Sequence, residues 1–192
     1  MIFNNLNAII IVIIIIICTF ALELESKDQL KNKMAIIQDT YICNSVVLAK
    51  YIASYANAHN FGINMTKLQK LLYISYGVYL AVTGNRLTNE HPQAWPYGPV
   101  FPTTRNKLLK YNLEDISGFQ DSSISQEVEA CVRLVFNSYG KYNASYLSAW
   151  SHKPDSPWDK IVNTVGFKWG KEIPDEYILP YFKTLLISRN GQ

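Results

Sequence analysis

The stretch over residues 65–83, MTKLQKLLYISYGVYLAVT, constrains the fold most, because apolar side chains cover nearly its whole helical circumference. A helix that is apolar on all sides is buried by other elements of the protein. Gly84 follows it and suits a C-cap, while Thr66 with Gln69 fits a capping box at its start. We therefore expect a central, buried helix over 65–83. One face of it is formed by Leu68, Leu71, Leu72, Tyr76, Tyr79 and Val82.

Helical patterns recur on both sides of this central helix. Asn44 can cap one helix, and Ser123 with Gln126 can open another. Pro174 falls in the first turn of a last helix, in which Pro180 is expected to cause a kink or a break. Short extended or irregular segments are expected near 85–98 and 113–120. The fold class predicted is mainly α, a compact bundle of about six or seven helices around 65–83. The further helices are expected at about 44–60, 102–110, 123–140, 144–150, 158–165 and 172–186.

Residues 1–33 form an apolar leader that contains the run IIIVIIIII over residues 9–17. It fits a membrane anchor through residues 2–22, since about 20 apolar residues span a bilayer. A secretory signal fits less well, because no basic residue precedes Lys27 and no good cleavage site follows. The third interpretation is a true start at Met34, with the leader being translated upstream sequence. We favour Met34, and so expect residues 34–192 to form a single cytoplasmic domain, with membrane anchoring through 2–22 as the alternative.

The composition indicates a globular protein and disfavours several functional classes. Hydrophobic residues make up 48% and charged residues 17% of the chain, enough apolar material for a core. The net charge of +3 is lower than a dedicated nucleic-acid binder carries. The three cysteines are isolated, which favours a reducing compartment over a disulfide framework. No histidine or cysteine spacing indicates a metal site.

No constellation in the sequence indicates catalysis strongly. Phosphate-binding loops and nucleophile elbows are absent from the sequence. The best candidate for an enzyme is a nucleophilic pair of Cys131 and His152, with Asp155 nearby in sequence. Cys131, however, falls on the apolar stripe of its helix, where cysteine usually behaves as a small hydrophobe. We expect no enzymatic activity and no cofactor or metal.

The basic residues of two segments are interpreted as a solvated face. TKLQK contributes Lys67 and Lys70, and RNKLLK contributes Arg105, Lys107 and Lys110. Charges at such helical positions usually point to water. Nucleic acid is therefore not an expected partner.

Two loops combine aromatic residues with prolines. The first is AWPYGPVFP over 94–102, and the second is SHKPDSPW over 151–158. Such aromatic side chains can seal a core at the ends of helices. They can equally face a partner, because aromatic residues on rigid loops commonly anchor protein interfaces. Both interpretations stay open for Trp95 and Tyr97.

Four segments, in this order, resemble the Panacea-domain family of SocA-like antitoxins, whose members are also described as phage-associated proteins. They are KLQKLLY (67–73), AWPYGPVFP (94–102), LSAWSHKPDSPWDK (147–160) and EIPDEYILPYF (172–182). The resemblance runs from about residue 45 to 186. Ser151 stands where the family usually has Thr, which keeps the hydroxyl group, and Trp150 replaces a residue such as Leu. The isoleucine-rich leader has no counterpart in the family pattern.

The resemblance implies a helical domain that binds and neutralises a toxin encoded by an adjacent gene. The alternative that it implies is an adaptor that delivers a toxin or client protein to a protease. A small-molecule substrate is not expected, and a membrane is a partner only if the segment 1–22 is real. The residues predicted to bind the partner or to support its surface are Lys67, Gln69, Trp95, Tyr97, Gly98, Pro99, His152 and Trp158.

Overall fold

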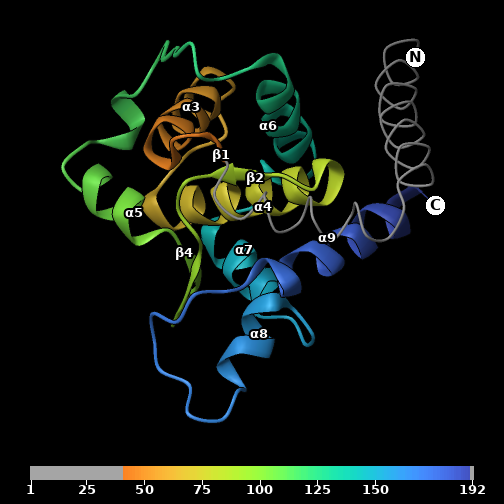
Figure 1. The fold of residues 1–192 in the computed structure, drawn as a ribbon. Helices are drawn as coiled ribbons and strands as arrows, with labels where there is room; N and C mark the ends of the chain where they lie inside the picture. The colour runs from red at the N-terminus through yellow and green to blue at the C-terminus, as the bar shows by residue number, and fades with distance from the viewer. Residues whose placement is uncertain (1–40, 191–192) are drawn as a thin grey trace.

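The computed structural model describes residues 41–190 (Figure 1). The expectations for the leader 1–33, the anchor 2–22 and the start at Met34 lie outside these residues. Within the described range, no helix combines the length and the apolar character that crossing a membrane requires.

The described residues form a mainly helical fold, as the sequence predicted. Two short pairs of strands accompany the helices: β1 pairs in parallel with β2, and β3 with β4 forms an antiparallel hairpin. The strands are β1 Tyr41–Cys43, β2 Arg86–Thr88, β3 Gln93–Trp95 and β4 Gly98–Val100. The helices are α3 Ser45–Ala58, α4 Met65–Thr83, α5 Pro102–Leu108, α6 Gln126–Tyr139, α7 Ala144–Ser151, α8 Pro157–Val162 and α9 Asp175–Asn190, with a 3-10 turn at Leu113–Asp115.

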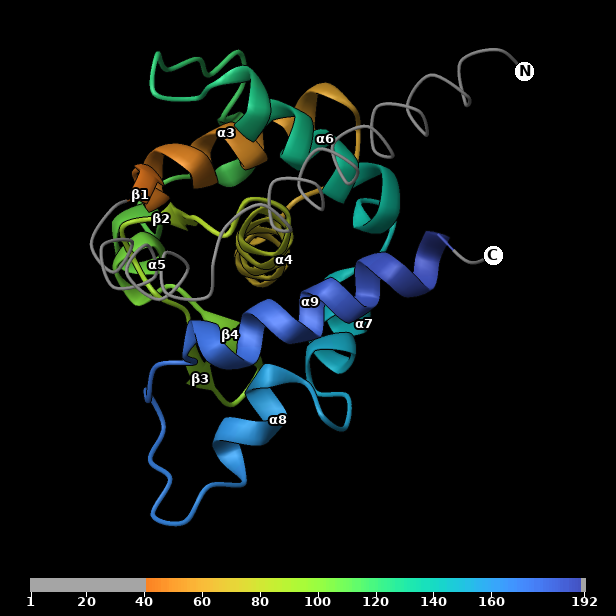
Figure 2. The same cartoon turned by 45° about the vertical axis from the view of Figure 1, so that its right-hand side comes forward.

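Helix α4 is the centre of the core, with the predicted bounds. Figure 2 shows it nearly end-on, with α3 and α6 on one side and α7 and α9 on the other. Every residue from Lys67 to Ala81 is buried, including Tyr73 and Tyr76. Gly84 ends the helix in the left-handed conformation with a φ of 75°, as predicted. The position of α4 follows directly from its apolar circumference.

The approach of α9 to α4 depends on a glycine in the middle of α4. The ring of Phe182 lies directly over Gly77, and a Cβ there would be 2.3 Å from a ring carbon. Phe182 is itself buried and packs edge-on against Tyr73. Gly77 therefore lets the two helices approach more closely than a side chain would allow.

Both predicted capping boxes were wrong. The N-cap of α4 is Asn64, whose side chain accepts a 2.9 Å hydrogen bond from the Lys67 amide, while Thr66 is exposed. Asn is a stronger N-cap than Thr, and it stands two residues earlier. The cap of α6 is Ser125, because Ser123 is held by Asp121 through both its amide and its hydroxyl group.

Other departures from the sequence expectations are local. Helix α9 runs through Pro180 as one element, so the proline does not split it. The 113–120 segment begins with a 3-10 turn. The predicted extended pieces near 85–98 are β2, β3 and the start of β4. The pairing of β2 with β1 was not foreseen, because β1 is only three residues long.

Candidate functional site

The AWPYGPVFP segment folds as the β3–β4 hairpin and the entry into α5. Trp95 pairs with Gly98 at the end of the ladder, so Pro96 and Tyr97 form a two-residue loop. Tyr97 is 76% exposed at this tip, while Trp95 is half-buried. Gly98 has a φ of +100°, which L side chains rarely adopt. The hairpin thus points one aromatic side chain outward from a buried base.

The base of the hairpin is fixed by Lys70 and Ser151. A Cβ at Gly98 would lie 2.4 Å from Ser151 Oγ and 2.8 Å from Lys70 Cε. The Lys70 Nζ donates a 3.0 Å hydrogen bond to the Pro99 carbonyl. Gly98 and Pro99, both predicted site residues, are buried and serve as this base.

The interpretation of Lys67 and Lys70 as a solvated face is wrong. The two side chains are only 5% and 1% exposed. Burial lowers the pKa of Lys70 to about 7 and also lowers the pKa of Lys67. They are buried because α4 is surrounded on all sides, and each ammonium group finds backbone carbonyls as acceptors.

Lys67 lies apart from the hairpin. Its Nζ donates to the carbonyls of Phe61, at 2.6 Å, and Gly140, at 2.8 Å. These carbonyls belong to the α3–α4 connection and to the end of α6. Lys67 therefore ties two chain turns to the start of α4.

Gln69 contacts the segment that follows the hairpin. Its Oε1 accepts a 2.7 Å hydrogen bond from the Phe101 amide, and both residues are buried. Phe101 is the N-cap of α5 and offers no side-chain cap. Gln69 thus fixes the point where β4 turns into α5.

His152 and Trp158 pack against the other side of the hairpin. The rings of these two residues are stacked with centroids 3.9 Å apart. The Trp158 indole donates a 2.9 Å hydrogen bond to the Trp95 carbonyl. Burial, and secondarily the charge of Lys70, lower the pKa of His152. Within the described residues, His152 Nε2 is buried with no hydrogen-bond partner.

Six of the eight predicted residues therefore form the buried part of the hairpin or contact the hairpin and the segment that follows it. They are Gln69, Trp95, Gly98, Pro99, His152 and Trp158. Tyr97 is the exposed tip of the hairpin, and Lys67 lies elsewhere on α4. Sequence reasoning missed Lys70 and Ser151 as site residues. The signal for Lys70 was present, because a helix predicted to be buried all round has no face left for a solvated lysine.

The segment between α8 and α9 extends the aromatic surface beside the hairpin. It is attached to β3 by two bonds, from the Ala94 amide to the Lys171 carbonyl at 2.8 Å and from the Gly170 amide to the Ala94 carbonyl at 2.9 Å. Trp169 in this segment is 57% exposed. We call Trp95, Tyr97, Trp158, Phe167 and Trp169 the aromatic face.

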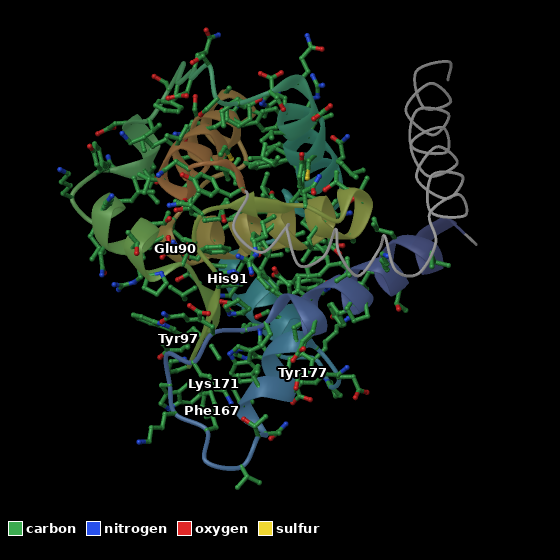
Figure 3. The ribbon with its side chains drawn as sticks, viewed as in Figure 1. Glu90, His91, Tyr97, Phe167, Lys171 and Tyr177 are labelled. Atoms are coloured by element: carbon green, nitrogen blue, oxygen red, sulfur yellow. The ribbon has the colours of Figure 1, made fainter. Side chains whose placement is uncertain are left out.

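Ring contacts connect most of the aromatic face. Phe167 meets Trp169 edge-on at 4.9 Å, and Trp169 lies 6.3 Å from Trp158. The Arg105 guanidinium group lies 5.6 Å from the Trp95 ring centroid. Figure 3 shows Tyr97 and Phe167 at the same end of the molecule. Sequence reasoning missed Phe167 and Trp169, although an aromatic pair between Gly166 and Gly170 resembles the two loops that it singled out.

A carboxylate, Glu90, holds the segment just before the hairpin to two helices (Figure 3). It accepts hydrogen bonds from the Thr103 amide, from the Thr104 amide and hydroxyl, and from the Ser45 hydroxyl. Glu90 thus replaces the missing N-cap of α5 and joins it to the start of α3. This role is structural.

The cysteine chemistry considered for an enzyme does not match the environment of Cys131. Its thiol is buried and lies 3.5 Å from the Ser75 carbonyl, and burial raises its pKa to about 12. A nucleophilic cysteine requires the opposite shift. No group of three or more metal-ligating side chains occurs within residues 41–190.

Comparison with known proteins adds to this geometry. The sequence model of the family described as "Antitoxin SocA-like, Panacea domain" matches residues 68–159. The chain is also similar to the protein named Antitoxin SocA of Caulobacter vibrioides (strain NA1000 / CB15N), with 29% identity over 148 residues, covering 69% of this chain and 78% of that relative. No solved structure matches the chain significantly. These matches confirm the resemblance that the sequence motifs indicated: residues 68–159 match the Panacea-domain model, and the chain is similar to Antitoxin SocA over most of its length.

Proposed function

We propose that this chain is the antitoxin of a toxin–antitoxin pair and neutralises the product of a neighbouring gene by binding to it directly. The similarity to Antitoxin SocA and the Panacea-domain match support an antitoxin role. We propose the aromatic face as the surface that contacts the toxin.

We choose this surface because the tip of the hairpin is exposed while its base is buried. Tyr97 is 76% exposed, whereas Gly98 and Pro99 directly after it are buried against α4. A large aromatic side chain presented on a rigid support loses little conformational entropy on binding. Trp169, 57% exposed and in ring contact with Trp158 and Phe167, provides a second anchor on the aromatic face.

The test is co-expression of this chain with the adjacent open reading frame. We expect that reading frame to arrest growth alone and to be harmless beside the wild-type chain. The variant Tyr97→Ala with Trp169→Ala should lose neutralisation and keep a wild-type melting temperature. Tyr41→Ala is the matched control, because Tyr41 is 52% exposed on β1, away from the hairpin.

Two outcomes would contradict the proposal. If the neighbouring product is harmless alone, the antitoxin role fails. If the double variant neutralises as well as Tyr41→Ala does, the role of the aromatic face fails. The steady-state amount of toxin separates direct neutralisation, which leaves it unchanged, from delivery to a protease, which lowers it.

A further inference from the structure

A groove lined by lysines lies between α3 and α5, apart from the aromatic face. It has a volume of about 440 Å³ and is lined by Val46, Lys50, Asn106, Lys107, Lys110 and Tyr111. We call these residues the lysine groove. Figure 1 shows α3 and α5 on the same side of the molecule. A volume of this size falls in the range of small-ligand sites, roughly 300–1,000 Å³.

The lysine groove carries positive charge that the described residues do not neutralise. Three of its lining residues are lysines, and none is acidic. The ion pairs found within residues 41–190 involve Asp175 with Arg86 and His91, and none involves these lysines. Lys107 lies in the last turn of α5 and Lys110 just past its end, and both line the groove.

Aromatic rings hold two of the ammonium groups in position. Lys50 Nζ lies 5.0 Å from the Tyr111 ring centroid and 5.6 Å from that of Phe119. Lys110 Nζ lies 5.5 Å from the same Tyr111 ring. The ammonium groups of Lys50 and Lys110 are therefore both held at the Tyr111 ring. Because these two side chains are already positioned, they lose less conformational entropy when a ligand binds.

We propose that the lysine groove binds a phosphate-bearing ligand. Three point charges suit the several oxygens of a phosphate or polyphosphate group, which neutralises more than one cation at a time. Asn106, which also lines the groove, adds an amide donor. The phosphate belongs either to a free polyphosphate compound such as a nucleotide or to the backbone of a nucleic acid. This site does not depend on the antitoxin role.

The experiment measures binding of two probes to the full chain, tripolyphosphate by calorimetry and a labelled 20-nucleotide single-stranded DNA by fluorescence anisotropy. We expect the triple variant Lys50→Gln, Lys107→Gln and Lys110→Gln to weaken phosphate binding at least 10-fold. The matched control, Lys141→Gln, Lys160→Gln and Lys183→Gln, removes the same charge from exposed positions elsewhere and should leave binding unchanged. Circular dichroism melts check that both variants fold.

The probes distinguish the two sources of phosphate. Tight tripolyphosphate binding that DNA cannot displace supports a free ligand. A nucleic-acid backbone is supported if the affinity for DNA falls as the salt concentration rises. The slope of the logarithm of the DNA-binding constant against the logarithm of the salt concentration should then be smaller in magnitude by about 2 in the groove variant. The proposal is overturned if neither probe binds, if both triple variants lose affinity equally, or if poly-glutamate competes as well as tripolyphosphate does.

Discussion

Tyr76 and Asp175 are 99 residues apart in sequence, and their side chains form a 2.7 Å hydrogen bond. The same carboxylate accepts a 3.0 Å bond from Arg86 Nε. Asp175 opens α9, Tyr76 lies in the middle of α4, and Arg86 begins β2. Burial and the neighbouring Asp175 raise the pKa of the Tyr76 hydroxyl group. One carboxylate thus fixes where α9 starts relative to the core.

Asp175→Asn is expected to destabilise the fold by about 1–3 kcal/mol, because it weakens two partly buried bonds at once. The free energy of unfolding in urea measures this loss. Glu176→Gln is the control, since Glu176 is exposed and shares the favourable position at the helix start. Equal losses in the two variants would mean that only the helix-start charge matters.

Gly98→Ala is expected to destabilise the protein by roughly 2–5 kcal/mol, combining a strained backbone with overpacking against Ser151 and Lys70. Gly84→Ala separates these two effects. Gly84 also has a positive φ, of 75°, but nothing lies within 4 Å of a Cβ there. We expect a loss of about 1 kcal/mol at Gly84. Thermal and urea unfolding of both variants give the comparison, and equal losses would rule out the packing effect.

The buried amine of Lys70 should make stability depend on pH. Its pKa is about 7 in the folded protein, and an unfolded chain restores the ordinary value near 10.4. Between these values the unfolded state binds more protons, so the free energy of unfolding rises with pH. We expect a gain of about 1–2 kcal/mol between pH 7 and 8.5. Above pH 9, Cys43 and Cys131 act in the opposite direction, because burial raises each thiol pKa to about 12.

Lys70→Met should abolish this gain, since the apolar side chain has no proton to bind. Urea unfolding midpoints at pH 7.0, 7.75 and 8.5 provide the measurement. Lys183→Met, at an exposed position of α9, is the control and should keep the wild-type pH dependence. If the stability of Lys70→Met rose with pH as steeply as that of the wild type, Lys70 would have to stay protonated in the folded protein.

His152 should report on the charge of Lys70. Burial is the larger cause of its lowered pKa, and the charge of Lys70 is the second. In Lys70→Met the pKa of His152 should therefore move upward, toward its ordinary value near 6.5. An NMR titration of the His152 ring protons measures the change. Identical titration curves in the two proteins would contradict the coupling.

The helices were predictable where the sequence pattern was strong. Residues 65–83 could be placed because their apolar side chains leave no solvent face, and Gly84 marks the end. Caps were less predictable, because Asn64 and Thr66 are both good caps and only the backbone decides between them. The pairing of β1 with β2 was not predictable, since strands of three residues carry too little pattern.

The candidate site was predictable as a segment but not in its detail. The motif AWPYGPVFP indicated a stiff aromatic loop, and the segment folds as the β3–β4 hairpin. Sequence alone could not say that Tyr97 is exposed while Trp95 is half-buried, because this depends on where the two-residue turn falls. It also could not bring Lys70, Gly98 and Ser151 together, since these residues come from three separate elements.

In the β3–β4 hairpin, a position that tolerates substitution, Tyr97, directly precedes one that does not, Gly98. Gly98 is confined by backbone conformation and by two side chains, while Tyr97 projects past the surface. Substitutions at Tyr97 can therefore accumulate without disturbing the scaffold that carries them. Under the proposed role of Tyr97 in toxin binding, a lineage could in this way acquire recognition of a different partner in single mutational steps, with every intermediate still folded.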